Sequence, residues 1–108
     1  MILVVEDNQD YQGLLRASGF TGLLASNAVD ALALLETEAI SIVYCDFHGI
    51  QKDGRDAHWI AEYCAGNDID FKIATSDFTM VQVFREQYGV GSIDKLDMLR
   101  SLSGRRVI

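Results

Sequence analysis

The stretch ISIVYCDFHG at residues 40–49 contains a buried strand that ends at a single carboxylate, Asp46. Its β-branched and aromatic residues show no alternating polar face, which is typical of a strand covered by helices on both sides of a parallel sheet. We therefore predict a central strand from Ile40 to Asp46. In open parallel sheets, chemistry gathers at the carboxyl ends of the strands, beside the point where strand order reverses. Asp46 is thus the first candidate for a functional residue.

A second strand of the same kind opens the chain at residues 2–5 and ends in Glu6 and Asp7. If the two strands are parallel neighbours, their carboxyl ends meet at one edge of the sheet, and Glu6, Asp7 and Asp46 converge there. Three crowded carboxylates require a cation. Mg²⁺ suits this set, because it is usually bound by one or two carboxylates together with water and phosphate oxygens.

The composition indicates one globular domain spanning residues 1–108, since a chain of this length holds a real core but no second domain of normal size. The hydrophobic content of 49% is ordinary for a soluble protein. No apolar run reaches membrane-spanning length, and the N-terminus lacks the features of a signal peptide. We therefore expect a cytoplasmic protein without membrane contact.

Charge and cysteine usage exclude two further classes of site. The formal net charge of −7 argues against nucleic-acid binding, and the only basic cluster, Arg100, Arg105 and Arg106, is too small to override it. Cys45 and Cys64 lack the spacing of metal ligands or of a redox pair. We expect both cysteines to be buried apolar residues without a disulfide.

Strands and helices alternate along the rest of the chain, as hydrophobic periodicity and capping residues indicate. Strands are predicted at residues 20–25, 40–46, 71–75 and 91–94, and helices at 8–19, from 26, from 54, 76–89 and 97–102, with the tail from Ser103 to Ile108 unassigned. Five strand–helix alternations favour an α/β domain with helices on both faces of the sheet and right-handed crossovers.

Polar or charged residues lie at or directly after the ends of four predicted strands, those that begin at residues 2, 40, 71 and 91. They are Glu6, Asp7, Asp46, Thr75 or Ser76, and Lys95. Taken singly, each has a structural alternative as a helix cap, a turn residue or a surface amine. Taken together, acids after two central strands, a hydroxyl after the fourth and a cation after the fifth form a complementary set that indicates a phosphoryl-transfer site.

Over nearly its whole length, the chain resembles the receiver domains of two-component response regulators. The matching segments are ILVVED at 2–7, ASNAVDAL at 25–32, residues 42–46 with Asp53-Gly54 at the family's spacing, and Lys95. The resemblance implies a flavodoxin-like, doubly wound sheet of five parallel strands in the order 2-1-3-4-5 with helices on both faces, an order known from a chemotaxis member of this family.

The resemblance also implies the metal ligands. Asp7 and Asp46 would bind Mg²⁺ directly, and Glu6 directly or through water. The third protein ligand would be the backbone carbonyl of His48. The ring of His48 is expected to flank the site, because neither His48 nor His58 has the spacing of a histidine metal ligand.

The remaining implied roles concern the phosphoryl group. Asp46 would be the phosphoacceptor, and Lys95 would pair with the acyl phosphate. Ser76 matches the family's hydroxyl position, and Thr75 is the adjacent alternative. Phosphorylation would then shift the loop and helix after the fourth strand and the face around the fifth.

The chain departs from the family pattern at several positions. Ser92 stands where the family usually has an aromatic switch residue. Leu96 and Ile50 replace two usual prolines, so we expect no cis peptide bond after Lys95. The first helix is about one turn shorter than usual, and the last is also short. Trp59 is expected to be a core or partly exposed packing residue, with partner recognition as the alternative, and Met80, Phe84 and Tyr88 are expected to be core contacts.

These features lead us to expect a stand-alone receiver that catalyses only its own phosphorylation and dephosphorylation. Its partners would be a sensor histidine kinase or histidine phosphotransfer protein and a downstream protein, and the chain would be a monomer or weak dimer. The main alternative is a binding module of receiver fold that works without phosphorylation. An aspartyl-phosphate hydrolase is disfavoured because His48 stands where a second acid is needed, and a flavin carrier because the acidic residues 6–9 would repel phosphate.

Overall fold

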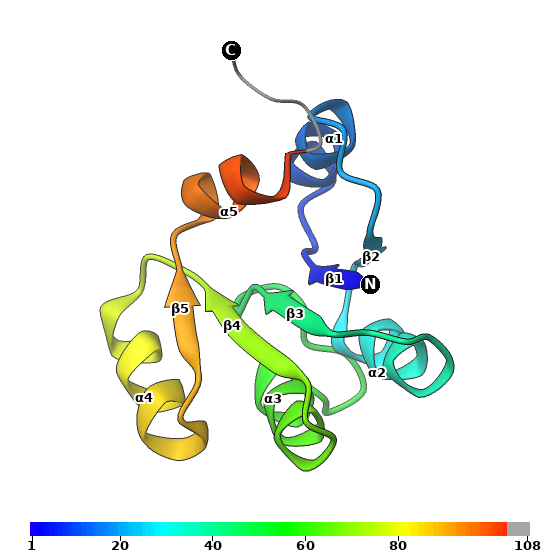
Figure 1. Cartoon of the computed structure of the whole chain (residues 1–108). Helices are drawn as coiled ribbons and strands as arrows, with labels where there is room; N and C mark the ends of the chain where they lie inside the picture. Colours follow the sequence, from blue (N-terminus) through cyan, green and yellow to red (C-terminus); the bar gives the residue numbers. More distant parts are fainter. Residues whose placement is uncertain (104–108) are drawn as a thin grey trace.

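The computed structural model describes residues 1–103 as a three-layer α/β fold (Figure 1). A parallel sheet in the order β2-β1-β3-β4-β5 separates α1 and α5 on one face from α2, α3 and α4 on the other. The predicted fold class and strand order are therefore confirmed. The strands are β1 (Ile2–Val5), β2 (Leu23–Ala25), β3 (Ile42–Cys45), β4 (Asp70–Ala74) and β5 (Gly91–Ile93). The helices are α1 (Gln9–Ala17), α2 (Ala28–Thr37), α3 (Ala57–Gly66), α4 (Phe78–Tyr88) and α5 (Lys95–Leu102).

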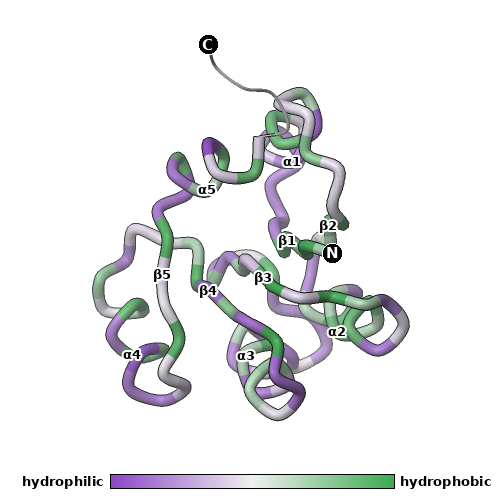
Figure 2. The backbone as a smooth tube through the Cα atoms, in the orientation of Figure 1, coloured by the Kyte–Doolittle hydropathy of each residue, from purple (hydrophilic) through white to green (hydrophobic). Residues whose placement is uncertain are grey.

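Strands β1 and β3 are neighbours at the centre of the sheet, and their register pairs Val5 with Cys45. Successive side chains of a strand point to opposite faces, and helices cover both faces here, so the side chains of β1 and β3 enter two different cores. Leu3 and Val5 belong to the core beneath α2, α3 and α4, whereas Val4 belongs to the core beneath α1 and α5. Figure 2 shows β1 as hydrophobic, which suits a strand that is buried along most of its length.

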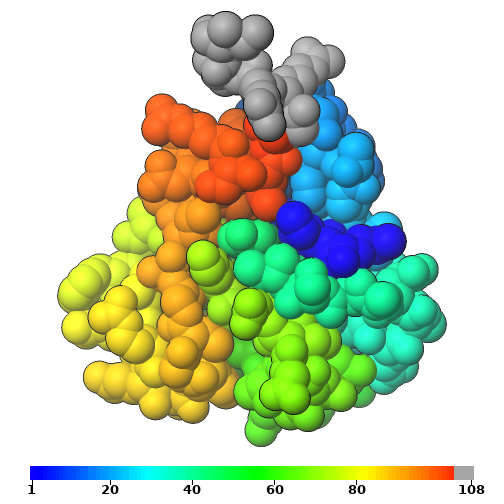
Figure 3. Space-filling model, viewed as in Figure 1, coloured from blue at the N-terminus to red at the C-terminus, as the bar shows by residue number. Residues whose placement is uncertain are grey.

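Two short helices, α1 and α5, cover the smaller core and touch one another at one end of the molecule (Figure 3). Each helix places few side chains in that core. Leu15 is the buried residue of α1, and Met98 and Leu102 are the buried residues of α5. The neighbouring apolar residue Leu14 is 55% exposed.

Strand β2 begins three residues later than predicted, because Phe20 belongs to the turn that ends α1. Gly19 adopts a left-handed conformation with φ of 91°. This turn lets the N–H of Phe20 donate to the Leu15 carbonyl at 3.1 Å. Phe20 is therefore a core residue that follows a helix terminus rather than part of a strand.

Helices α3 and α5 also begin elsewhere than predicted, in each case after an aspartate cap. Residues 52–55 form a tight turn, so Gly54 lies outside α3, and the side chain of Asp56 caps Ala57 onward by accepting from the His58 N–H at 3.0 Å. Asp94 caps α5 by accepting from the Leu96 N–H at 2.8 Å, which makes Lys95 the first residue of that helix.

The structure also bears on several smaller predictions. Cys45 and Cys64 are buried and free of a disulfide. Phe84 is fully buried, as predicted, while Met80 and Tyr88 are only partly buried. Trp59 is 50% exposed, which agrees with partly exposed packing. Among residues 1–103 there is no cis peptide bond. Within the same residues, no helix combines the length and apolar character needed to cross a membrane. The unassigned tail and the basic residues Arg105 and Arg106 lie outside the described residues, apart from Ser103.

Candidate functional site

Three carboxylates meet at the carboxyl ends of β1 and β3, as the sequence predicted. One oxygen each of Glu6, Asp7 and Asp46 lies within 4.8 Å of the others. The ladder continues past both strands, because the Glu6 N–H donates to the Ala25 carbonyl and the Asp46 N–H to the Val5 carbonyl, each at 2.9 Å. This hydrogen bonding fixes the two acids at the sheet edge. Glu6 is 1% exposed and Asp46 is 7% exposed.

Glu6 has an incomplete set of partners. Its Oε1 accepts from the Lys95 ammonium at 2.8 Å, but its Oε2 is buried without a hydrogen-bond partner among the described residues. A buried carboxylate oxygen without a partner is costly. Burial, together with the neighbouring Asp46, raises the pKa of Glu6 to about 7, although Lys95 acts in the opposite direction. The set therefore fits a cation, which would satisfy Oε2.

Lys95 joins two of the acids. Its Nζ lies 2.8 Å from Glu6 Oε1 and 2.9 Å from Asp46 Oδ2. Burial lowers the pKa of Lys95, but the hydrogen bonds to the two carboxylates outweigh this effect, so the pKa is raised overall. Lys95 is thus a charged amine directed at Asp46, and its position as the first residue of α5 follows from the Asp94 cap.

Asp7, although exposed, lies close to the backbone of the loop that follows β3. Gly49 has a φ of +84°, and a Cβ at this position would lie 2.1 Å from Asp7 Oδ2. Only glycine fits this approach. The loop is held at both ends, because the Phe47 N–H donates to Asp46 Oδ1 at 2.8 Å and the carbonyl of the fully buried Ile50 accepts from the Ala28 N–H at 2.8 Å.

A hollow of about 320 Å³ opens above Asp46, and its walls come from three strand ends. It is lined by Asp46, His48, Thr75, Ser76, Asp94 and Lys95. The two predicted hydroxyls differ there, since Thr75 Oγ1 accepts from the Asp77 N–H at 3.0 Å in the turn before α4, whereas Ser76 is exposed. The structure thus brings every predicted site residue to one edge of the sheet.

His48 stands at the rim of this hollow. Its ring is 67% exposed, and Nε2 lies 3.8 Å from Asp77 Oδ2. The ring also meets the edge of Phe47, with a centroid distance of 5.0 Å. The predicted flanking position of the His48 ring agrees with this arrangement, while the role of its carbonyl as a metal ligand stays a prediction.

Two residues beside the site were missed by sequence reasoning. Gly49 is one, and Tyr11 is the other: the Tyr11 hydroxyl donates to the Lys95 carbonyl, and its ring centroid lies 5.4 Å from Lys95 Nζ. A sequence signal for Tyr11 did exist, because it lies one helical turn before the buried Leu15 and therefore on the same face of α1.

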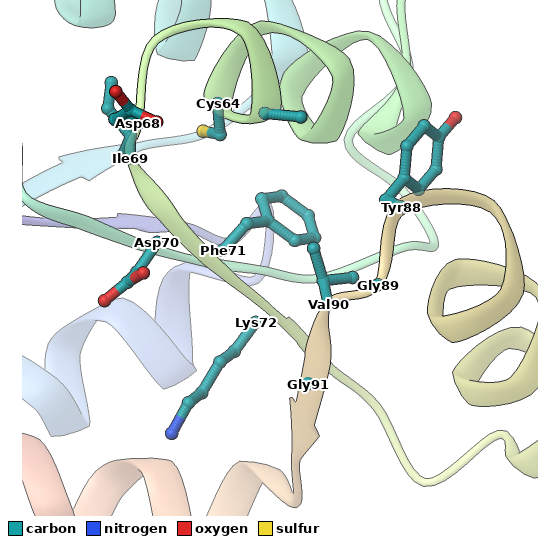
Figure 4. Close-up of a pocket in the computed structure, with 11 residues that line it drawn as sticks. Cys64, Asp68, Ile69, Asp70, Phe71, Lys72, Tyr88, Gly89, Val90 and Gly91 are labelled. Atoms are coloured by element: carbon teal, nitrogen blue, oxygen red, sulfur yellow. The ribbon is translucent and has the colours of Figure 1, made fainter.

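Another groove, of about 500 Å³, lies at the opposite end of β4, between the end of α3 and the turn from α4 to β5 (Figure 4). Its charged lining residues are Asp68, Asp70 and Lys72. They project apart in Figure 4 and do not converge on a common point. The groove therefore offers no second cluster resembling that at Asp46.

No family model matches the sequence, and no curated protein matches it. In a comparison of structures, the chain is similar to the crystal structure of a response regulator receiver domain protein (CheY-like) from Methanospirillum hungatei JF-1, with a TM-score of 0.66 and 18% sequence identity. The similarity covers 93% of this chain and 87% of that chain. Together with the strand order, it shows that this chain has the fold of a response regulator receiver domain.

Proposed function

We propose that this protein accepts a phosphoryl group on Asp46 from a phosphohistidine donor and signals through the resulting change of its surface. The observation that carries the proposal is the convergence of Glu6, Asp7 and Asp46 with the Lys95 ammonium at one edge of a receiver-fold sheet. Such a set has no evident role in stability alone, because the buried Glu6 Oε2 lacks a partner among the described residues.

In the proposed reaction, one carboxylate oxygen of Asp46 forms a bond to phosphorus while the phosphorus–nitrogen bond of the donor histidine breaks. The donor imidazole leaves with the electron pair of that bond and regains its neutral form by proton exchange with solvent. The hollow above Asp46 gives the phosphoryl group access to the carboxylate. Lys95, already 2.9 Å from Asp46 Oδ2, would balance the negative charge of the transferred oxygens.

Glu6, Asp7 and Asp46 would hold Mg²⁺, with the His48 carbonyl as a further ligand by analogy with the family. The orphaned Glu6 Oε2 supports this assignment. When bound, the ion would neutralise the carboxylates and the phosphoryl oxygens as a hard, oxygen-preferring cation. Ser76 is the proposed donor to a phosphoryl oxygen because it matches the family's hydroxyl position. Thr75 is the adjacent alternative, since its Oγ1 accepts from the Asp77 N–H and keeps its own proton free to donate.

The partners follow from this chemistry. A sensor histidine kinase or a histidine phosphotransfer protein would supply the phosphoryl group, and a downstream protein would recognise the altered surface. Ser76 and Asp77 directly precede α4, so a shift of Ser76 toward the phosphoryl group would reach the start of that helix. The chain would catalyse only its own phosphorylation and dephosphorylation.

The proposal is tested by intact-mass measurement and two-dimensional amide NMR, with Mg²⁺ and acetyl phosphate, on wild type and Asp46→Asn. We expect a single phosphoryl adduct in wild type and none in Asp46→Asn. Asp53→Asn is the matched control, because Asp53 is an exposed acid with φ of 52°, which asparagine tolerates. It should be phosphorylated like wild type.

A binding module that works without phosphorylation is the second candidate function, and it gives a different result. It predicts neither an adduct nor Mg²⁺-dependent shifts around Asp46. Two features support this candidate: Ser92 leaves the exposed β5 face without an aromatic side chain, and Lys95 already pairs with two of the three acids. The absence of an adduct in wild type would therefore move the assignment to this module.

A further inference from the structure

Tyr11 contacts Lys95 at two points, although the two residues lie on different helices. The Tyr11 hydroxyl donates to the Lys95 carbonyl in the first turn of α5. The Tyr11 ring lies beside the ammonium, with its centroid 5.4 Å from Nζ, within the range of a cation–π contact. One side chain of α1 therefore touches both the backbone and the charged end of the lysine directed at Asp46.

Apart from the ion pairs of Lys95 with Glu6 and Asp46, few side chains anchor the first turn of α5. Leu96 is 53% exposed, Asp97 is also exposed, and the first buried side chain of the helix is Met98. The cap by Asp94 sets where the helix begins but contacts only its backbone. The contact with Tyr11 therefore ties the Lys95 turn directly to the neighbouring helix α1.

Tyr11 also differs from the other partners of Lys95 in charge. Glu6 and Asp46 hold the ammonium through ion pairs, and these weaken when a cation binds Glu6 or when Asp46 becomes an acyl phosphate. Tyr11 is neutral, and burial raises the pKa of its phenol despite the nearby Lys95 ammonium. Its hydroxyl therefore remains a donor whatever the charge on the carboxylates.

We propose that Tyr11 is a positioning residue for Lys95, fixing the start of α5 through its hydroxyl and the direction of the ammonium through its ring. This inference rests on the proposed function, in which Lys95 stabilises the transferred phosphoryl group. Tyr11 keeps Lys95 directed at Asp46 while the ion pairs to Glu6 and Asp46 are exchanged for contacts to phosphoryl oxygens.

The test uses the full chain with three variants. Tyr11→Phe removes the hydroxyl and keeps the ring, whereas Tyr11→Leu removes both contacts. Tyr63→Phe is the matched control, because the Tyr63 hydroxyl also donates to a main-chain carbonyl, that of Leu35 at 3.5 Å, on the opposite face of the sheet. With Mg²⁺ and acetyl phosphate, we expect phosphorylation of Tyr11→Phe to slow about fivefold, the effect of one neutral hydrogen bond. Tyr11→Leu should be slower still, and Tyr63→Phe unchanged.

Two readouts separate positioning from a general structural effect. The Mg²⁺ dissociation constant of Tyr11→Phe should stay close to that of wild type, because its proposed ligands are carboxylates that Tyr11 does not touch. In a double-mutant cycle, Tyr11→Phe should have no further effect on the rate once Lys95→Ala is present. Equal effects of Tyr11→Phe in the presence and absence of Lys95 would overturn the proposal.

A last measurement does not depend on phosphorylation. In wild type without Mg²⁺ or a phosphodonor, the ε-methylene protons of Lys95 should show a ring-current shift that Tyr11→Phe retains and Tyr11→Leu loses. If wild type forms no adduct, the proposed function fails, yet this shift still shows whether Tyr11 holds Lys95. Lys95 signals that match those of exposed lysines in wild type would refute the contact itself.

Discussion

The two faces of the sheet are built with very different amounts of packing, and Asp46 lies between them. Among the described residues, seventeen buried residues form the core beneath α2, α3 and α4, whereas seven form the core beneath α1 and α5. We call these the large and the small core. Side-chain alternation continues past β1 and β3, so Glu6 and Asp46 meet Lys95 on the side of the small core. The position of the Lys95 ammonium therefore depends on the less packed face of the sheet.

The large core reaches Asp46 through its neighbour Phe47. The Phe47 ring meets the edges of Phe84 and His58, with centroid distances of 5.9 Å and 6.0 Å. His58 in turn stacks on Phe84 at 4.5 Å and pairs its Nδ1 with the Tyr88 hydroxyl at 2.7 Å. The difference between the faces suggests that the large core fixes the loop after β3, while a few polar contacts fix Lys95.

The strongest test of this comparison removes one side chain from each core. Phe84→Ala should lower the free energy of unfolding by about 3–5 kcal/mol, because it leaves a cavity in the large core. Met98→Ala removes fewer atoms from the small core and should cost less within the range of about 2–5 kcal/mol for such changes. Chemical denaturation measures both values.

The rates should rank in the opposite order. Met98 lies in the helix that begins at Lys95, so Met98→Ala should slow phosphorylation more than Phe84→Ala, measured where both variants are folded. A slower reaction in Phe84→Ala than in Met98→Ala would show that the large core controls the site and would contradict the comparison.

The second test concerns the ionisation of Glu6, which lies on the side of the small core. The pKa of Glu6 is raised from 4.5 to about 7 by burial, so between these values the folded protein keeps a proton that the unfolded chain has released. The free energy of unfolding without Mg²⁺ should therefore fall as the pH rises from 4.5 to about 7, by at most about 3 kcal/mol, and level off above that range.

Glu6→Gln is the control for this pH dependence, since glutamine cannot ionise and the fall should largely disappear. Denaturant unfolding at a series of pH values measures it. Mg²⁺ binds the ionised carboxylate, so its affinity for wild type should increase over the same range. The same pH dependence in wild type and in Glu6→Gln would show that another group is responsible.

The sheet and its acids could be predicted because their signals are local. Apolar runs rich in β-branched residues indicate β1 and β3, and Glu6 and Asp46 follow these strands directly, so the pairing of the two strands brings the acids together. Phe20 shows where this reasoning fails: its side chain suits a strand, but the hydrogen bond of its N–H to Leu15 belongs to the end of α1. The predicted starts of α3 and α5 were also wrong, because the sequence offers several polar residues as possible caps. In the structure, Asp56 caps α3 and Asp94 caps α5.

Contacts between distant segments could not be predicted in this way. Tyr11 and Lys95 are 84 positions apart, and nothing in the pattern of either helix specifies their contact. Gly49 could be recognised as a turn residue, but the approach of its backbone to Asp7 depends on the packing of the whole loop. Such contacts depend on tertiary distances, which composition and periodicity do not contain.

Gly49 offers the smallest but most specific test, on the side of the large core. Gly49→Ala combines a strained positive φ with a Cβ placed 2.1 Å from Asp7 Oδ2, so Asp7 or the loop must move. The expected loss of stability is about 1–3 kcal/mol, and Mg²⁺ affinity should fall because Asp7 is displaced. Gly54→Ala separates the two effects, since Gly54 has a similar φ of +75° but no atom beyond its chain neighbours within 4 Å of the added Cβ. Gly54→Ala should show the backbone strain while keeping Mg²⁺ affinity, measured by titration under the same conditions. Equal losses of affinity in both variants would mean that strain in the β3–α3 loop, rather than the contact with Asp7, governs the carboxylate site.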